Sequence, residues 1–227
     1  MQEKSLINGW IVGYGGSKMD SFLDTTVIIK YLEYGYIKES LRKRCFEHIT
    51  ASKNKVFISF IVKNELDRVV LQRKEMYEYI LKKIKDPSYE LDHKKTIYLN
   101  KQDILFIQEF CLKLKDKDTR RLKQDFESEI DFLRVSLDIF LKNKVNEIAI
   151  AKSDLDSFAL SLINDSLNDF ADSRVLTSAI QMQKNKDIFF FVTADKHFSP
   201  NEYEFIRTEP RLKDYKFPKL KNLLYET

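Results

Sequence analysis

Short apolar runs along the chain predict buried β-strands. Residues 55–60 and 187–193 are rich in β-branched and aromatic residues, and a shorter apolar run covers residues 21–23. Runs of this kind without polar alternation are typical of strands that are buried on both faces of a sheet. A weaker pattern at residues 218–224 predicts an edge strand.

Between these runs, apolar residues recur at intervals of three and four, which predicts amphipathic helices. We expect helices after Asp24 and over residues 37–49, 62–83, 154–162 and 169–183. Pro87 ends the third of these patterns, because proline lacks the backbone N–H that a helix interior needs. Strands that alternate with helices predict an α/β fold on a parallel sheet.

The segment from residue 87 to residue 145 is helical in character and carries two apolar stripes. One stripe consists of Leu105, Phe106, Phe110 and Leu114, and the other of Leu122, Phe126, Ile130, Leu133, Leu137 and Phe140. The second stripe is long enough for a helix of about 25 residues. We expect the two stripes to form an antiparallel pair of helices.

Composition supports a packed core without long linkers. Hydrophobic residues make up 43% of the 227 residues, with only 5 glycines and 4 prolines. The glycines at positions 9–16 match neither nucleotide-binding pattern: Lys18 stands where a dinucleotide fingerprint needs glycine, and Gly16-Ser17-Lys18 reverses the order of a P-loop. They predict an N-terminal strand and turn instead.

The net charge of +4 is small, but its distribution is uneven. Residues 72–123 contain 14 Lys and Arg against 9 Asp and Glu, and the rest of the chain is close to neutral. Such a block favours contacts with a phosphate backbone, although a solvated helix face has the same composition. The densest positions are Lys82, Lys83, Lys85, Arg120 and Arg121, with Tyr77, Tyr79 and Tyr98 nearby as candidates for base stacking.

Cys45 and Cys111 are the two cysteines, and neither belongs to a CxxC motif or lies near a histidine pair. Their spacing disfavours a zinc site and a disulfide scaffold. The first residues lack the apolar stretch of a signal peptide, and no run approaches the length of a spanning helix. We therefore expect a cytoplasmic protein without membrane contacts.

Acidic residues stand where the predicted strands end or where the next helices begin. They are Asp24, Glu65, Asp172 and Asp195, with Asp169 three residues before Asp172. In a parallel sheet these carboxylates gather at one edge, where open α/β folds bind ligands. Their mutual repulsion is relieved by a hard divalent ion with oxygen ligands, such as Mg²⁺ or Mn²⁺.

Each carboxylate also has a simpler interpretation. Asp24 and Asp169 can cap helices, Asp195 can sit in a turn, and Glu65 can pair with Arg68 on a helix surface. The combination of all of them favours a metal-dependent hydrolase of phosphodiesters. None of the three histidines is needed for that chemistry. His197, beside Asp195, is the one candidate for a substrate contact, and we do not expect that contact.

Four segments together resemble the acidic motifs of PIN-domain ribonucleases. They are Asp24-Thr-Thr-Val-Ile-Ile, Ser59 followed by Glu65-Leu66, Asp172-Ser173 followed by Ala179, and Val192-Thr-Ala-Asp-Lys-His-Phe198. The resemblance covers about residues 18–72 and 160–200. It implies that Asp24, Glu65, Asp172 and Asp195 bind Mg²⁺ or Mn²⁺, with Asp169 as an auxiliary ligand. It also implies supporting roles for Thr26, Ser59 and Thr193.

The resemblance further implies a three-layer α/β/α sandwich that hydrolyses single-stranded RNA and leaves a 5′-phosphate. Residues 1–72 and 157–227 would form this nuclease core, and residues 73–156 would form a helical insertion. Many PIN ribonucleases are toxins, so an antitoxin or another regulatory protein, or a homodimer, is an implied partner. The large insertion departs from a minimal PIN domain.

Two other function classes remain open on the sequence alone. A PIN-like module that binds RNA or protein without cleaving would require the loss of an acidic ligand, and none of the four is missing. An aspartyl-phosphate phosphatase would require a second aspartate shortly after Asp24, where Thr25 and Thr26 stand.

Overall fold

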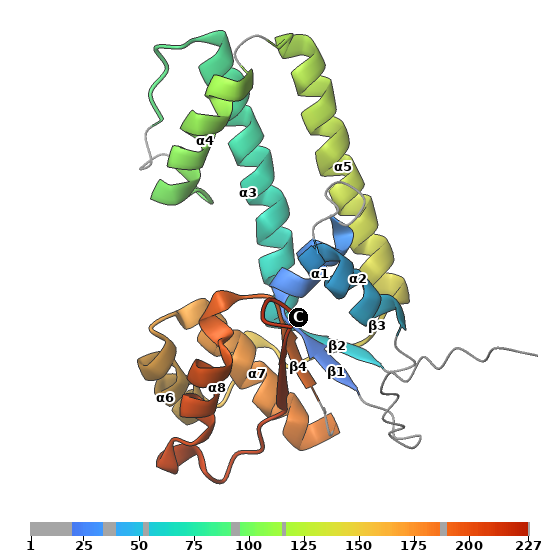
Figure 1. Ribbon diagram of the computed structural model, residues 1–227, viewed down its shortest axis with the longest axis vertical. Helices are drawn as coiled ribbons and strands as arrows, with labels where there is room; N and C mark the ends of the chain where they lie inside the picture. The colour runs from blue at the N-terminus through green and yellow to red at the C-terminus, as the bar shows by residue number, and fades with distance from the viewer. Residues whose placement is uncertain are drawn as a thin grey trace, which may run out of the picture.

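The central element of the fold is a sheet of five parallel strands in the order β3-β2-β1-β4-β5 (Figure 1). A computed structural model describes residues 20–33, 40–51, 55–91, 96–114, 117–186 and 190–226. The strands are β1 (Ser21–Leu23), β2 (Val56–Ser59), β3 (Val145–Ala149), β4 (Phe190–Thr193) and β5 (Lys219–Asn222). Because all five run in the same direction, their carboxyl ends share one edge. The predicted α/β class with a parallel sheet is confirmed.

Helices surround this sheet and extend beyond it. They are α1 (Thr25–Leu32), α2 (Ser40–Ala51), α3 (Phe60–Lys85), α4 (Lys101–Leu114), α5 (Thr119–Asn143), α6 (Ser157–Leu167), α7 (Phe170–Lys186) and α8 (Pro200–Arg207). In Figure 1, α6, α7 and α8 lie to one side of the sheet, and α1 and α2 lie to the other. None of the described helices is long and apolar enough to cross a membrane.

Most of the predicted strands are confirmed. All residues of β1 and β2 are buried, and β5 is an edge strand as expected. Of the predicted run at 187–193, the described part is β4, whereas residues 187–189 and the strand and turn expected at residues 9–16 lie outside the described part of the chain. The sequence did not predict β3, because polar Asn146 and Glu147 interrupt its apolar pattern.

Helix α3 begins directly after β2, because Ser59 caps it. The Ser59 hydroxyl accepts a hydrogen bond from the backbone N–H of Val62 at 3.3 Å. The helix then continues without interruption to Lys85, just before Pro87. The division expected between residues 72 and 73 therefore falls inside one helix. The segment 73–156 also contributes β3 to the sheet, where it pairs with β2.

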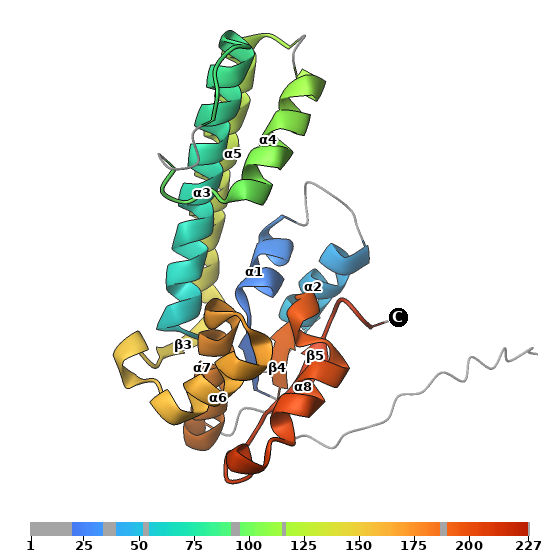
Figure 2. The ribbon, with the colours of Figure 1, turned by 90° about the vertical axis from the view of Figure 1, so that its left-hand side faces the viewer.

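Helices α3 and α5 form an antiparallel arm that projects from the sheet (Figures 1 and 2). The rings of Tyr77 on α3 and Phe126 on α5 stack with centroids 4.1 Å apart. All six apolar residues predicted for the α5 stripe are buried: Leu122, Phe126, Ile130, Leu133, Leu137 and Phe140. The long helix expected at this stripe is thus confirmed.

The pairing expected for the other apolar stripe is wrong, because α4 packs mainly on α3 and α5 finds its long partner in α3. Helix α4 meets α3 through Ile107 and Cys111, which are buried. Leu105 and Phe106 of the predicted stripe are more than half exposed. The helical spacing was correct, and Phe110 and Leu114 pack against the core, but Leu105 and Phe106 lie outside the buried face.

A buried network of charges joins the arm to the α1–α2 layer. Glu33, at the end of α1, forms ion pairs with Arg42 of α2, at 3.2 Å, and with Arg73 of α3. Arg73 also contacts Glu129 of α5, at 3.4 Å. The side chains of Glu33 and Arg42 are only about 10% exposed. Because water hydrates neither charge well, each is stabilised mainly by the ion pair with the other.

We predict that Glu33→Gln lowers the free energy of unfolding by about 3 kcal/mol, because it leaves the buried Arg42 guanidinium uncompensated. The change is measured by urea denaturation. The control is Glu47→Gln, which removes an exposed partner of Lys43 on α2 and costs at most about 0.5 kcal/mol. Equal losses for the two variants would contradict a central role of the network.

Candidate active site

Asp24 lies at the carboxyl end of β1, directly before α1, and is only 4% exposed. Its Oδ2 atom accepts hydrogen bonds from the hydroxyls of Thr26, at 2.6 Å, and Thr193, at 2.7 Å. Although Asp24 occupies the N-cap position of α1, its side chain makes no capping hydrogen bond. The capping interpretation therefore fails, and the two threonines fix the carboxylate.

Glu65 comes from the second turn of α3. Its Oε2 atom accepts a hydrogen bond from the Thr25 hydroxyl at 2.7 Å. Its Oε1 atom is buried without a hydrogen-bond partner among the described residues. A buried carboxylate oxygen without a hydrogen-bond donor is energetically costly. A donor or a positive charge placed at this atom would therefore stabilise the folded protein.

Ser59 has a structural position. It is fully buried, and its hydroxyl accepts a hydrogen bond from Ser178 of α7 at 3.0 Å, in addition to capping α3. The predicted supporting role of Ser59 thus takes the form of joining β2, α3 and α7, the elements that carry Glu65 and Asp172.

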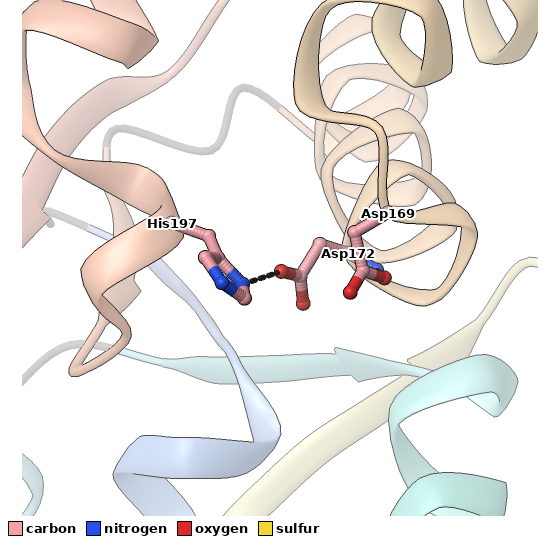
Figure 3. Close-up of side chains that lie close together, drawn as sticks. All are labelled: Asp169, Asp172 and His197. Carbon is pink, nitrogen blue, oxygen red and sulfur yellow. Dashed lines mark hydrogen bonds and ion pairs between the residues drawn. The ribbon is translucent and has the colours of Figure 1, made fainter.

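Asp169 and Asp172 lie at the start of α7. The Oδ1 atom of Asp169 accepts hydrogen bonds from the backbone N–H groups of Ala171, at 2.9 Å, and Asp172, at 3.1 Å, so Asp169 caps the helix. Asp172 is one turn further on, and its Oδ2 atom lies 2.8 Å from Nδ1 of His197 (Figure 3). In this capping position, the carboxylate of Asp169 lies beside that of Asp172.

Asp195 and His197 lie in the turn after β4. The backbone N–H of Asp195 donates to the Thr193 hydroxyl at 3.0 Å, and the Asp195 carboxylate accepts from the backbone N–H of His197 at 2.8 Å. Nδ1 of His197 is 3.5 Å from the same carboxylate. Thr26 accepts from the backbone N–H of Ala194 at 3.1 Å, so the turn is tied to the start of α1.

Burial makes the negative charge of this cluster unfavourable. It raises the pKa of Asp24, although hydrogen bonds from Thr26 and Thr193 oppose the shift. Burial, with the nearby charges of Asp24 and Asp172, raises the pKa of Glu65 to about 7. Burial also raises the pKa of Asp172 to about 7. The hydrogen bond with His197 opposes this shift, and the negative charges of Asp24, Asp169 and Asp195 add to it.

Electrostatic interactions link the five predicted acids: Asp24 acts on Glu65, Asp172 and Asp195, and Asp172 also acts on Asp169 and Asp195. Asp169, Asp172 and His197 are the described residues whose ligand atoms all lie within 4.8 Å of one another. The free Oε1 atom of Glu65 and the raised pKa values indicate that the nearby charge of Arg174 does not offset the burial and mutual repulsion of the carboxylates. Carboxylate oxygens with one imidazole nitrogen fit a divalent ion.

Of the residues that fill this site, His197 received least weight from the sequence. A histidine two positions after an acidic residue is a weak signal, because its partner Asp172 lies 25 positions away in the sequence. The available clue was its place directly after the predicted strand that ends at Thr193. The alternative partner considered for Glu65 was Arg68, which is exposed.

The residues predicted to bind nucleic acid lie elsewhere. Lys82, Lys83, Lys85, Arg120 and Arg121 gather at the far end of the arm, where α3 ends and α5 begins (Figure 1). A rise of 1.5 Å per residue puts this basic tip about 30 Å along α3 from Glu65.

The basic side chains at the tip of the arm differ in how available they are for binding. Lys83 donates to the backbone carbonyls of Pro87 and Tyr89, whereas Arg120 and Arg121 are exposed. The expected stacking role of Tyr77 and Tyr79 is wrong, because both are only 8% exposed. They belong to the core of the arm.

No protein-family model, curated protein or solved structure matches this chain. Its function is therefore inferred from the site.

We predict that the metal-free protein loses stability as the pH rises from 4.5 to 7.5. The folded state keeps protons on Glu65 and Asp172 up to a pH of about 7, whereas the unfolded state releases them near pH 4. Raising the pH across this window therefore favours unfolding. We expect a loss of about 1–3 kcal/mol by urea denaturation in EDTA.

Asp172→Asn should flatten this dependence, and Mn²⁺ or Mg²⁺ should restore the stability of the wild type at pH 7.5. Asp165→Asn, which changes an exposed carboxyl on α6, serves as the control and should keep the wild-type slope. Burial lowers the pKa of His48 to about 4, which acts in the opposite direction over this window, so the decisive quantity is the difference between the variants. An equal pH slope in Asp172→Asn and the wild type would refute the burial of these charges.

Proposed function

We propose that this protein is a metal-dependent endoribonuclease of the PIN type, which hydrolyses phosphodiester bonds of single-stranded RNA. The observation that carries the proposal is the partly buried carboxylate cluster beside the carboxyl ends of β1 and β4, in which the Oε1 atom of Glu65 has no hydrogen-bond partner among the described residues. The cofactor is Mg²⁺ or Mn²⁺.

The architecture supports this proposal. Helices lie on both sides of the parallel sheet in Figure 1, which agrees with a three-layer α/β/α sandwich. The acids converge from four places in the chain: the end of β1, the start of α3, the start of α7 and the turn after β4. These are the four places at which the sequence resembles the PIN motifs.

In this proposal Asp24, Glu65, Asp172 and Asp195 hold the ion, with Asp169 as an auxiliary ligand. When bound, a divalent ion supplies positive charge for the phosphate and lowers the pKa of water. The chain prepares the ligands: Thr26 and Thr193 orient Asp24, Thr25 orients Glu65, and His197 orients Asp172. Such preorganisation limits rearrangement during the reaction.

Exposed aromatic rings at the starts of the two helices that carry Glu65 and Asp172 favour a single-stranded substrate. Phe60 directly follows Ser59 at the end of β2 and is 44% exposed, and Phe170 directly follows Asp169 and is 54% exposed. The guanidinium of Arg174 lies 5.8 Å from the centre of the Phe170 ring. Unpaired bases stack on such surfaces, whereas bases within a duplex are already stacked.

We predict that Asp24→Asn lowers the rate of cleavage of a single-stranded RNA by about 10²-fold or more in Mn²⁺, because it removes a charge at the ion. The assay is single-turnover cleavage followed on a gel. The control is Asp20→Asn, at the opposite end of β1, where the side chain accepts a hydrogen bond from the backbone N–H of Lys55. This control should keep the wild-type rate.

Cleavage that survives Asp24→Asn or an excess of EDTA would contradict the nuclease proposal. RNA binding without cleavage in either ion would favour the non-catalytic alternative, a module that binds RNA or protein.

We also predict that Arg120→Glu with Arg121→Glu weakens RNA binding. Losing two phosphate contacts should reduce the slope of log K against log salt by up to about 1.4 for a single strand. Fluorescence anisotropy over a range of salt concentrations measures the slope. The control is Lys142→Glu with Lys144→Glu, at the opposite end of α5. An unchanged slope for the Arg120 and Arg121 variant would exclude the tip from the RNA interface.

A further inference from the structure

We propose that His197 is a nitrogen ligand of the divalent ion and that it makes the site prefer Mn²⁺ to Mg²⁺. This inference rests on the proposed function. It concerns which ion the site selects, a property that the four acids alone do not determine.

The position of the imidazole supports this role. Its Nδ1 atom lies 2.8 Å from Oδ2 of Asp172 (Figure 3). The same atom lies 3.5 Å from Oδ1 of Asp195, so the imidazole faces two carboxylates at once. Asp169 completes a group of three residues whose ligand atoms lie within 4.8 Å of one another. Ligands at about 2 Å from a metal lie within about 4 Å of one another, so small side-chain rotations would bring these three donors around one ion.

The turn that carries His197 is fixed from several directions. Phe198 is fully buried and packs edge-on against Phe191 of β4, with ring centroids 5.0 Å apart. The side-chain amide of Asn222 donates to the backbone carbonyls of Asp195, at 2.6 Å, and Phe198, at 2.8 Å. The backbone on both sides of His197 is therefore held in place.

The imidazole itself is not part of this packing. The His197 side chain is 46% exposed, whereas the neighbouring Phe198 is fully buried. The fixed backbone thus presents a partly solvated ring to the carboxylates. This arrangement allows Nδ1 to exchange its contact with Asp172 for a contact with an ion without any change in the fold.

The chemistry of the donors then determines the preferred ion. Mg²⁺ prefers oxygen ligands in a near-octahedral arrangement and retains several waters. Imidazole nitrogen suits transition-metal ions, and Mn²⁺, although it shares the preference of Mg²⁺ for carboxylate oxygens, is the transition-metal ion of the two. Adding one nitrogen to a set of carboxylates therefore shifts the preference towards Mn²⁺. Removing it should leave an all-oxygen site that binds Mg²⁺ and Mn²⁺ with more similar affinities.

Electron spin-echo envelope modulation of the Mn²⁺-loaded protein tests this directly, because a coordinated imidazole gives a nitrogen signal. The wild type should show this signal, and its frequencies should change when the histidines carry nitrogen-15. His197→Gln should lack the signal, and His48→Gln, which removes an imidazole on α2, should retain it. In competition experiments, the ratio of Mg²⁺ to Mn²⁺ dissociation constants should fall about tenfold in His197→Gln.

The outcomes separate this inference from the proposed function. If Mn²⁺ binds the wild type with no histidine nitrogen signal, the inference is overturned and the carboxylate metal site stands. If Mn²⁺ does not bind the wild type at all, the proposed function is overturned as well. The isotope comparison uses only the wild-type sequence, so it shows whether a histidine binds Mn²⁺ even if His197→Gln fails to fold. Loss of the signal in His48→Gln would then overturn the assignment to His197.

Discussion

The partial removal of several carboxylates from water is the constraint on which the rest of this structure depends. Burying one carboxylate is unfavourable, and burying Asp24, Glu65 and Asp172 close enough to repel one another is more unfavourable still. The fold compensates in part with hydroxyl donors from Thr25, Thr26 and Thr193 and with one imidazole. The Oε1 atom of Glu65 has no hydrogen-bond partner among the described residues, and this is the basis for proposing that a cation completes the site.

The sequence predicted those parts of the structure that depend on local pattern. Continuous apolar runs identified β1, β2 and β4, and parallel order then brought their carboxyl ends to one edge. This argument predicts the positions of Asp24 and Asp195 at that edge without any knowledge of side-chain contacts. The buried stripe of α5 was equally clear, because its spacing persists over the length of the helix.

Other parts depend on contacts between distant residues and could not be predicted in this way. The edge strand β3 owes its place to pairing with β2, since its own sequence is half polar. The tyrosines of α3 were expected to be available to bases, but Tyr77 is covered by Phe126, which comes from the other side of the arm. His197 gains its position from a turn that is fixed by Asn222 at the sheet edge.

Helix α3 has a consequence beyond its packing. Glu65 lies near its first residue and Lys82 to Lys85 near its last, and the helix between them is continuous. A strand of RNA anchored at the lysines would therefore meet the acids at a distance fixed by the helical rise. The arm would then act as a molecular ruler, and the number of residues in α3 would define how far from its anchor the strand is cut.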